Sequence, residues 1–390
     1  MRDLYSKTEK LLFIYGFLII AFLVSTSTKN PIYNWDIIPY IGSTLTLDSR
    51  NIEEIHSLTY KTLSSNIPEK EFEKLINDRN ESINYRKSVY EKPEIFKEQL
   101  NFYFIKPFYI GSIYLLKTTG LQIIDAIYTL SILACISTSL LLLYWTNLYL
   151  NANISFIVTL LIGVQSKLFV IGRMPTPDAL SVFTVLLALF FLVERKNLKA
   201  TTLLLMASIF IRPNNIIITL LVLTYLTYLS HHQKNKSDFY FFILTIASSI
   251  LIYFSIGKLL NRYDWWTLFH HSFIQNLNYP SKFDSSFSID EYIAVITLQV
   301  KGLFMMAYGF PSTMIIFIFI NIITFNMDKF SKDKPHTNPI LILSIIIVLN
   351  YLAHLFLFPG VIQWDRFFTS FYIFSAIALI SKISPNLSRT

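Results

Sequence analysis

Long apolar runs separated by short polar connections dominate this chain. Runs of about 17–25 residues can cross roughly 30 Å of hydrocarbon as helices. Helices are expected because lipid cannot satisfy free backbone groups. We therefore predict an all-α, polytopic integral membrane protein with about ten crossings and additional interfacial helices. The predicted crossings are 11–27, 122–145, 153–171, 177–194, 200–213, 214–231, 238–256, 308–325, 339–358 and 366–383.

Two further apolar segments, 102–116 and 289–307, each contain a lysine. Counting 102–116 as a crossing would move the basic link 194–199 to the other side of the membrane, against the positive-inside rule. We therefore place both segments in the membrane interface, where lysines reach the headgroups. Whether either segment spans the membrane is left open.

The distribution of charge orients the helices. Compact basic links at 194–199, 231–236 and 329–334 predict that they and both chain ends are cytoplasmic, in a cell membrane. The loop 28–121 carries 12 Lys/Arg and 12 Asp/Glu, so the net charge of +8 does not come from it and no nucleic acid partner is expected. We predict one domain, 1–390, with the loops 28–121 and 257–290 as a small outer cap.

Composition excludes an ordinary soluble domain, with 53% hydrophobic residues, 15% charged residues and a mean hydropathy of +0.48. Cys135 is the single cysteine, so it predicts neither an intramolecular disulfide nor thiol chemistry. The first apolar run resembles a signal peptide with a small-residue site at 25–27. A retained helix is favoured because the chain continues into further crossings.

Asp36 follows the first apolar run and precedes a long loop with many charges. In one interpretation it only caps a helix that begins at Ile37. In the other it is a general base at the membrane surface that activates an acceptor hydroxyl. The sequence does not decide between the two.

Three arginines stand where inward-running helices begin on the outer side: Arg173, Arg212 and Arg366. Helix N-termini carry partial positive charge and bind phosphate, which arginine also binds in a bidentate manner. Lys106 in the interfacial segment could contact the same headgroup. Snorkelling to the surface is the structural alternative for each. The helix that precedes Arg212 is short for a full crossing, however, so Arg212 is expected to face a wet cavity within the membrane.

Three other charged residues are supporting candidates: Asp178, Lys167 and Asp365. A helix start with Thr176 as N-cap makes a structural role for Asp178 the more common outcome. Lys167 lies inside an apolar run, where ionisable residues are functional candidates by default, but it could equally pair with Asp125 or Asp178. Asp365 directly precedes Arg366.

His270 is the remaining supporting candidate, in an aromatic outer loop that could stack on sugar rings or form a membrane-interface belt. Its neighbour His271 points to a different face of a helix, so the pair is a poor chelate. No metal ligands are predicted.

The arrangement resembles the GT-C class of membrane glycosyltransferases, which includes the protein O-mannosyltransferases and the lipid A aminoarabinose transferases. The resemblance implies a polyprenyl-phosphate-linked sugar donor, an acceptor on the outer face, Asp36 as base and arginines on the lipid phosphate. Several such families have an Asp-Glu pair in the first loop, whereas Ile37 follows Asp36 here. A divalent metal is therefore an open alternative, and no other cofactor is expected. The segments that carry the likeness are Trp35-Asp36, Lys106-Pro107-Phe108-Tyr109, 173–178, Arg212-Pro213-Asn214 and Asp365-Arg366-Phe367.

We accordingly expect an inverting glycosyltransferase of cell-surface glycan or glycolipid assembly. Its partners are the lipid-linked donor, a lipid-linked or surface-glycan acceptor, and membrane lipids. Two alternatives use a similar basic cavity. A transporter or flippase would move the lipid-linked saccharide unchanged, although no repeated halves are evident in the sequence. A surface-polysaccharide polymerase or ligase would take a diphosphate-linked oligosaccharide.

Overall fold

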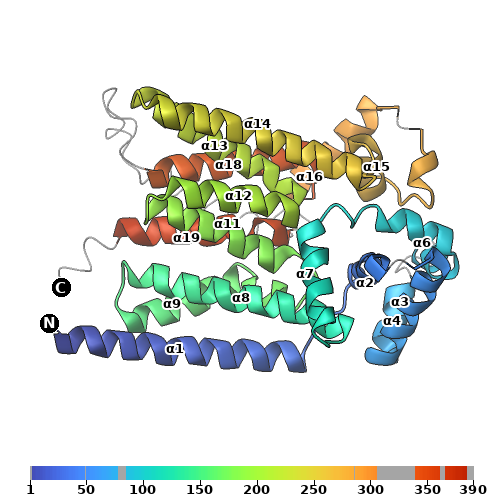
Figure 1. The fold of residues 1–390 in the computed structure, drawn as a ribbon, viewed down its shortest axis with the longest axis horizontal. Helices are drawn as coiled ribbons and strands as arrows, with labels where there is room; N and C mark the ends of the chain where they lie inside the picture. Colours follow the sequence, from blue (N-terminus) through green and yellow to red (C-terminus); the bar gives the residue numbers. More distant parts are fainter. Residues whose placement is uncertain are drawn as a thin grey trace.

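The computed structural model describes residues 2–48, 50–77, 85–284, 286–304, 339–360 and 365–383, and every regular element in these ranges is a helix. Long helices lie side by side in a bundle, and short helices form a cap at one end (Figure 1). The start of α1 and the end of α19 lie at the opposite end of the bundle. The predicted all-α fold is confirmed for the described residues. The bundle contains α1 (Arg2–Lys29), α8 (Ile123–Asn147), α9 (Ala152–Gln165), α10 (Leu168–Ile171), α11 (Asp178–Val193), α12 (Leu198–Ile211), α13 (Ile216–His232), α14 (Lys236–Leu259), α18 (Pro339–Leu357) and α19 (Thr369–Ile383).

Four helices of the described chain are long and apolar enough to cross a membrane. Their outer faces carry large exposed apolar side chains, such as Phe13 at 79% and Leu251 at 68% exposure, which lipid can cover. The protein is therefore membrane-associated and helical. The crossing-length segments are Thr8–Lys29, Ile123–Asn147, Pro213–His232 and Lys236–Leu259, and the shorter apolar helices are Ala152–Gln165, Asp178–Val193, Leu198–Ile211 and Ile342–Leu357.

The predicted crossing 153–171 differs from the structure. The chain breaks at Lys167, whose backbone is left-handed with φ of 59°, so α9 ends at Gln165 and α10 is a single turn. A lysine in this conformation interrupts the hydrogen-bond ladder that a continuous helix needs. The predicted crossing 308–325 and basic link 329–334 lie outside the described residues.

Local sequence signals explain many helix starts. Asn51 accepts a hydrogen bond from the backbone N–H of Glu54 and begins α3 (Ile52–Asn66), and Asn151 caps α9 through Ile154 in the same way. Asp264 accepts a hydrogen bond from the backbone N–H of Thr267 and begins α15 (Trp265–Phe273). Such side chains satisfy amide groups that have no partner in the first turn of a helix.

The segment predicted as the first outer loop folds into short helices, which we call the cap. The cap has its own apolar core, which includes Ile41, Leu63 and Phe96 and continues onto the first turns of α8. Packing around Gly42 is tight, because a Cβ there would lie 2.5 Å from the Phe96 ring. The cap contains α2 (Ile37–Leu45), η1 (Thr46–Asp48), α3 (Ile52–Asn66), α4 (Glu69–Ile76), α5 (Tyr85–Glu91), α6 (Pro93–Leu100) and α7 (Pro107–Thr118).

Helix α7 runs across the bundle helices rather than along them (Figure 1). It contacts α2, α8 and α12. Its 12 residues extend about 18 Å at 1.5 Å per residue, short of a bilayer core. The segment 102–116 therefore does not form one continuous spanning helix. For 289–307, α16 (Ile289–Phe304) covers the described part, and its place relative to a membrane stays a prediction.

A second segment, residues 262–284 with α15 (Trp265–Phe273) and η3 (Pro280–Lys282), lies beside the cap (Figure 1). We call it the α15 segment. Glu98 of the cap holds it by accepting from Tyr263 Oη and Ser281 Oγ, each at 2.6 Å. Trp265 Nε1 donates to the carbonyl of Leu357 at 2.8 Å, which ties α15 to the end of α18. The α15 segment is thus fixed to both the cap and the bundle.

Candidate functional site

Asp36 stands at the start of α2, but its side chain does not cap that helix. Its carboxylate instead accepts from Tyr103 Oη at 2.7 Å and from Asn34 Nδ2 at 3.2 Å, and it pairs with Arg366 at 2.9 Å. The interpretation of this side chain as a simple helix cap is therefore wrong. Its partners come from the cap, from the chain just before it and from the turn before α19.

Asp178 is the second carboxylate of the site, in the first turn of α11. Arg212, at the end of α12, donates to its Oδ1, and Arg366 Nε approaches Oδ2 at 3.0 Å. The latter contact is an ion pair without hydrogen-bond alignment, since Nε has no hydrogen-bond partner. Thr176 does not cap α11, contrary to the prediction, because the residue before the helix is Pro177 and the Thr176 hydroxyl donates to Asp178 at 2.9 Å. Asp178 thus neutralises two guanidinium groups.

The two carboxylates differ in their access to the cavity. The Asp178 side chain is 2% exposed, whereas that of Asp36 is 21% exposed. Arg366 bridges the two and is 19% exposed itself. Asp36 and Arg366 can therefore touch a bound molecule, while Asp178 acts through the arginines that it holds.

Charges around Asp36 determine its ionisation. Burial raises the pKa of a carboxylate, but the Arg366 guanidinium, the Tyr103 hydroxyl and the Lys106 ammonium outweigh burial and lower the pKa of Asp36 below its ordinary value. The carboxylates of Asp178 and Asp36 raise the pKa of Arg366 despite its burial. Asp36 is consequently an anion and Arg366 a cation at neutral pH.

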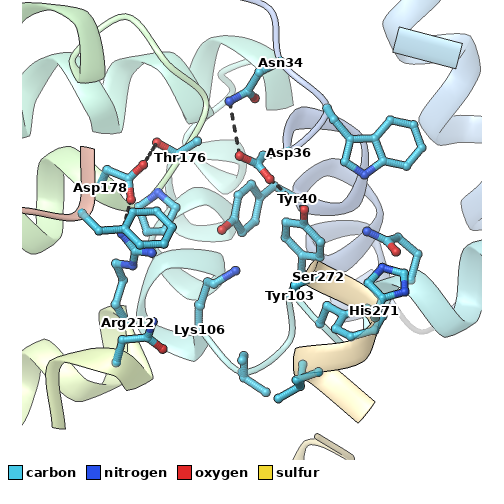
Figure 2. Close-up of a pocket in the computed structure, with 18 of the residues that line it drawn as sticks. Asn34, Asp36, Tyr40, Tyr103, Lys106, Thr176, Asp178, Arg212, His271 and Ser272 are labelled. Carbon is cyan, nitrogen blue, oxygen red and sulfur yellow. Dashed lines mark hydrogen bonds and ion pairs between the residues drawn. The ribbon is translucent and has the colours of Figure 1, made fainter. Parts of the chain in front are cut away.

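Lys106 precedes α7 and faces the same cavity, where Figure 2 shows it below Asp36. Its ammonium lies over the rings of Tyr103 and Tyr40, at 4.3 and 5.1 Å from their centroids. Burial lowers the pKa of Lys106 to about 7, and the attraction of Asp36 offsets only part of this effect. Among the described residues Lys106 has no ion-pair partner, so its charge is available to an anion.

These groups line a cavity of about 530 Å³ between the cap, the end of the bundle and the α15 segment. The carboxylates of Asp36 and Asp178 lie on its wall with Lys106 and Arg212 (Figure 2), and Arg366 lines it as well. Such a site can bind an anion and accept a proton within one cavity. The lining residues are Asn34, Trp35, Asp36, Tyr40, Tyr85, Arg86, Gln99, Phe102, Tyr103, Ile105, Lys106, Thr176, Pro177, Asp178, Arg212, Asn214, Leu268, His271, Ser272, Asn276, Phe358, Arg366 and Phe367.

Three candidates from the sequence do not line this cavity. Arg173 donates from Nε to the Asn30 carbonyl at 2.7 Å and so joins the end of α1 to the bundle. Lys167 occupies the break before α10. The His270 ring packs on Phe283 at 4.4 Å.

Asp365 begins η5 (Asp365–Phe368), but its side chain lies outside what the structure describes. The sequence prediction therefore grouped residues that the fold separates. Five of the residues predicted from the sequence do line the cavity: Asp36, Lys106, Asp178, Arg212 and Arg366.

Several cavity residues were missed by sequence reasoning, most clearly Tyr103, Gln99 and His271. Tyr103 is 67 positions from the carboxylate that it contacts, and no motif connects them. His271 was considered only as half of a chelating pair. Single neutral polar residues give no periodic signal, so nothing in the sequence separated these from their neighbours.

The described part of the cavity wall shows no cluster of metal ligands. Among the described residues, no group of three or more His, Cys, Asp or Glu side chains lies together. Asp36 and Asp178 are each occupied by a guanidinium group. We derive no chemistry through a metal at this site.

Comparison of the chain with family models, curated proteins and solved structures finds no match.

Proposed function

We propose that this chain is a membrane glycosyltransferase that moves a sugar from a polyprenyl-phosphate-linked donor to an acceptor hydroxyl on the extracytoplasmic face. The observation that carries the proposal is the ionised, partly exposed carboxylate of Asp36 beside Arg366 and Lys106 in one cavity. The resemblance to GT-C enzymes supports the same conclusion. The biological role would be cell-surface glycan or glycolipid assembly.

The proposed topology has about ten crossings, with both chain ends in the cytoplasm and the cap outside a bacterial-type cell membrane. The position of the cap at one end of the bundle supports this arrangement (Figure 1). Crossing-length helices provide the membrane anchor. A donor with its tail in lipid would then present its phosphate at the bundle end, where the cavity lies.

The basic side chains provide the phosphate site in this proposal. Arg366 and Lys106 line the cavity, and Arg212 is 11% exposed beside them. Guanidinium and ammonium groups stabilise the charge that develops on a leaving phosphate, above all where water is scarce. Asp178 is a positioning residue, because its side chain is only 2% exposed and is occupied by the two arginines that it orients.

In the proposed reaction, the acceptor oxygen attacks the anomeric carbon while Asp36 takes the hydroxyl proton. The bond from the anomeric carbon to the phosphate oxygen breaks, and its electron pair leaves with the lipid phosphate, which gains one negative charge. The proton then passes from Asp36 to water. Attack opposite to the leaving group inverts the anomeric configuration. A donor phosphate would compete for Arg366, and loss of that cation makes Asp36 a stronger base.

The proposal is tested with Asp36→Asn in membranes that contain a radiolabelled polyprenyl-phosphate sugar and an extract of envelope acceptors. Loss of a general base lowers turnover by roughly 10²–10⁴. Asp125→Asn is the matched control, since Asp125 is exposed in the first turn of α8 and does not line the cavity.

Full turnover by Asp36→Asn would remove it as the base. Analysis of the lipid products separates the alternatives. A flippase leaves the glycosidic bond intact, and a polymerase or ligase consumes a diphosphate-linked oligosaccharide instead of the monophosphate-linked sugar. Either result would replace the proposed function.

A further inference from the structure

The cavity has two chemically different halves, and the proposed reaction assigns a ligand to only one. The charged half holds the carboxylates and basic groups described above. The other half lies between the cap and the α15 segment, and Figure 2 shows Asp36 between the two, with His271 and Ser272 on the far side from Asp178. This second half is formed mainly by Trp35, Tyr85, Gln99, Phe102 and His271.

Gln99 presents a buried amide to this half. The residue is 4% exposed, and its Oε1 accepts a hydrogen bond from the Tyr85 hydroxyl. Its Nε2 has no hydrogen-bond partner among the described residues. A buried amide without a partner is unfavourable unless a ligand or water accepts from it.

His271 presents a second buried donor. The residue is 9% exposed, and its Nδ1 accepts from the backbone N–H of Leu277 at 2.9 Å, which places the ring proton on Nε2. Burial and the neighbouring His270 lower the pKa of His271 to about 4, so the ring is neutral. The described residues provide no partner for Nε2–H, and Phe102 stacks on the ring at 4.4 Å.

The basic side chain in this half already has partners within the protein. Arg86 is its one basic lining residue among those described, and its guanidinium lies over Trp35 at 5.2 Å and donates to the Lys74 carbonyl. The two donors without protein partners, on Gln99 and His271, are both neutral. Neutral donors beside aromatic surfaces match hydroxyl groups on a ring with apolar C–H faces better than they match phosphate.

We propose that this half of the cavity is a carbohydrate subsite that binds the acceptor sugar, with Gln99 Nε2 and His271 Nε2 donating to its hydroxyl oxygens. The inference rests on the proposed function and specifies its acceptor as a neutral saccharide. An acceptor held here places a hydroxyl next to Asp36, at the junction of the two halves. Donor phosphate and acceptor sugar thereby approach from opposite sides.

Binding can be measured without any transfer reaction. We suggest saturation-transfer difference NMR on the purified protein with methyl glycosides of hexoses, N-acetylhexosamines and 6-deoxyhexoses. An amine-oxide detergent is used because it has neither a sugar nor a phosphate headgroup. The variants are Gln99→Met and His271→Asn, in which the Asn Oδ1 can still accept from the Leu277 amide. Gln299→Met is the control, because Gln299 is also 4% exposed but does not line the cavity.

At least one glycoside should bind the wild type and Gln299→Met, and its affinity should fall about ten-fold in each subsite variant, as expected for one lost hydrogen bond. His271→Gln, which retains a distal N–H, should recover binding if His271→Asn is poorly folded. Binding by no glycoside, or wild-type affinity in both Gln99→Met and His271→Asn, overturns the subsite. Glycoside binding with this pattern, but no sugar transfer by the wild type, contradicts only the glycosyltransferase assignment.

Discussion

Removal of the buried carboxylate of Asp178 should destabilise the protein much more than removal of the carboxylate of Asp48. Asp178 is 2% exposed and neutralises both Arg212 and Arg366, while Asp48 is 18% exposed and pairs with Lys117 in the cap. At the 3.0 Å separation from Arg366, Coulomb attraction is about 5 kcal/mol at an effective dielectric constant of about 20. Desolvation offsets part of this gain in the intact site.

Asp178→Asn leaves two guanidinium groups with less compensation. Breaking a buried pair from one side costs about 3–5 kcal/mol, whereas loss of a partly exposed pair costs about 0–1 kcal/mol. The difference can be measured by SDS titration in mixed micelles, followed by tryptophan fluorescence, with Asp48→Asn as the control. The double variant Asp178→Asn with Arg212→Met should recover part of the loss, since one uncompensated cation is removed.

An Asp178→Asn protein that unfolds at the same SDS fraction as Asp48→Asn would refute this reasoning. So would a double variant that is less stable by the full sum of the two single changes, because independent effects would mean that Asp178 and Arg212 do not interact. The positioning role assigned to Asp178 would then have no physical basis.

Four other predictions follow from the structure. Because burial lowers the pKa of Lys106 to about 7, donor affinity should fall as pH rises from about 6 to about 8, and Lys106→Arg should flatten this dependence in plots of donor KM against pH. The pKa of Lys106 in the folded protein lies below its ordinary value of 10.5. The contribution of Lys106 to stability should therefore be complete above pH 10.5 and decrease as pH falls toward about 7. Gly42→Ala should cost about 1–3 kcal/mol by overpacking, since its Cβ meets the Phe96 ring at 2.5 Å; SDS titration measures this, and an unchanged midpoint would contradict the packing. A membrane-impermeant maleimide should label Ser65→Cys in the exposed part of α3 from outside intact cells, but Lys196→Cys only after lysis, and labelling of both from one side would contradict the proposed topology.

The sequence by itself determined the helical class of the described chain and several of its helix boundaries. Apolar length is a local property, and lipid or a packed core leaves the helix as the way to satisfy the backbone. Capping residues such as Asn51 and Asn151 act within three positions, so their effects could be read directly. The break at Lys167 was missed, because its left-handed backbone leaves no trace in hydropathy.

The composition of the cavity was decided by the tertiary structure alone. Asp36 and Arg366 are 330 positions apart, and Arg212 and Asp178 are 34 apart, yet each pair is in contact. Arg173 fitted the same sequence criterion as the other two arginines but lies against the end of α1. A local pattern specifies which side chains a helix end carries, whereas the packing of the cap on the bundle decides which of these ends face one another. Charge interactions fall off with distance, so only this packing could turn scattered charged residues into a site.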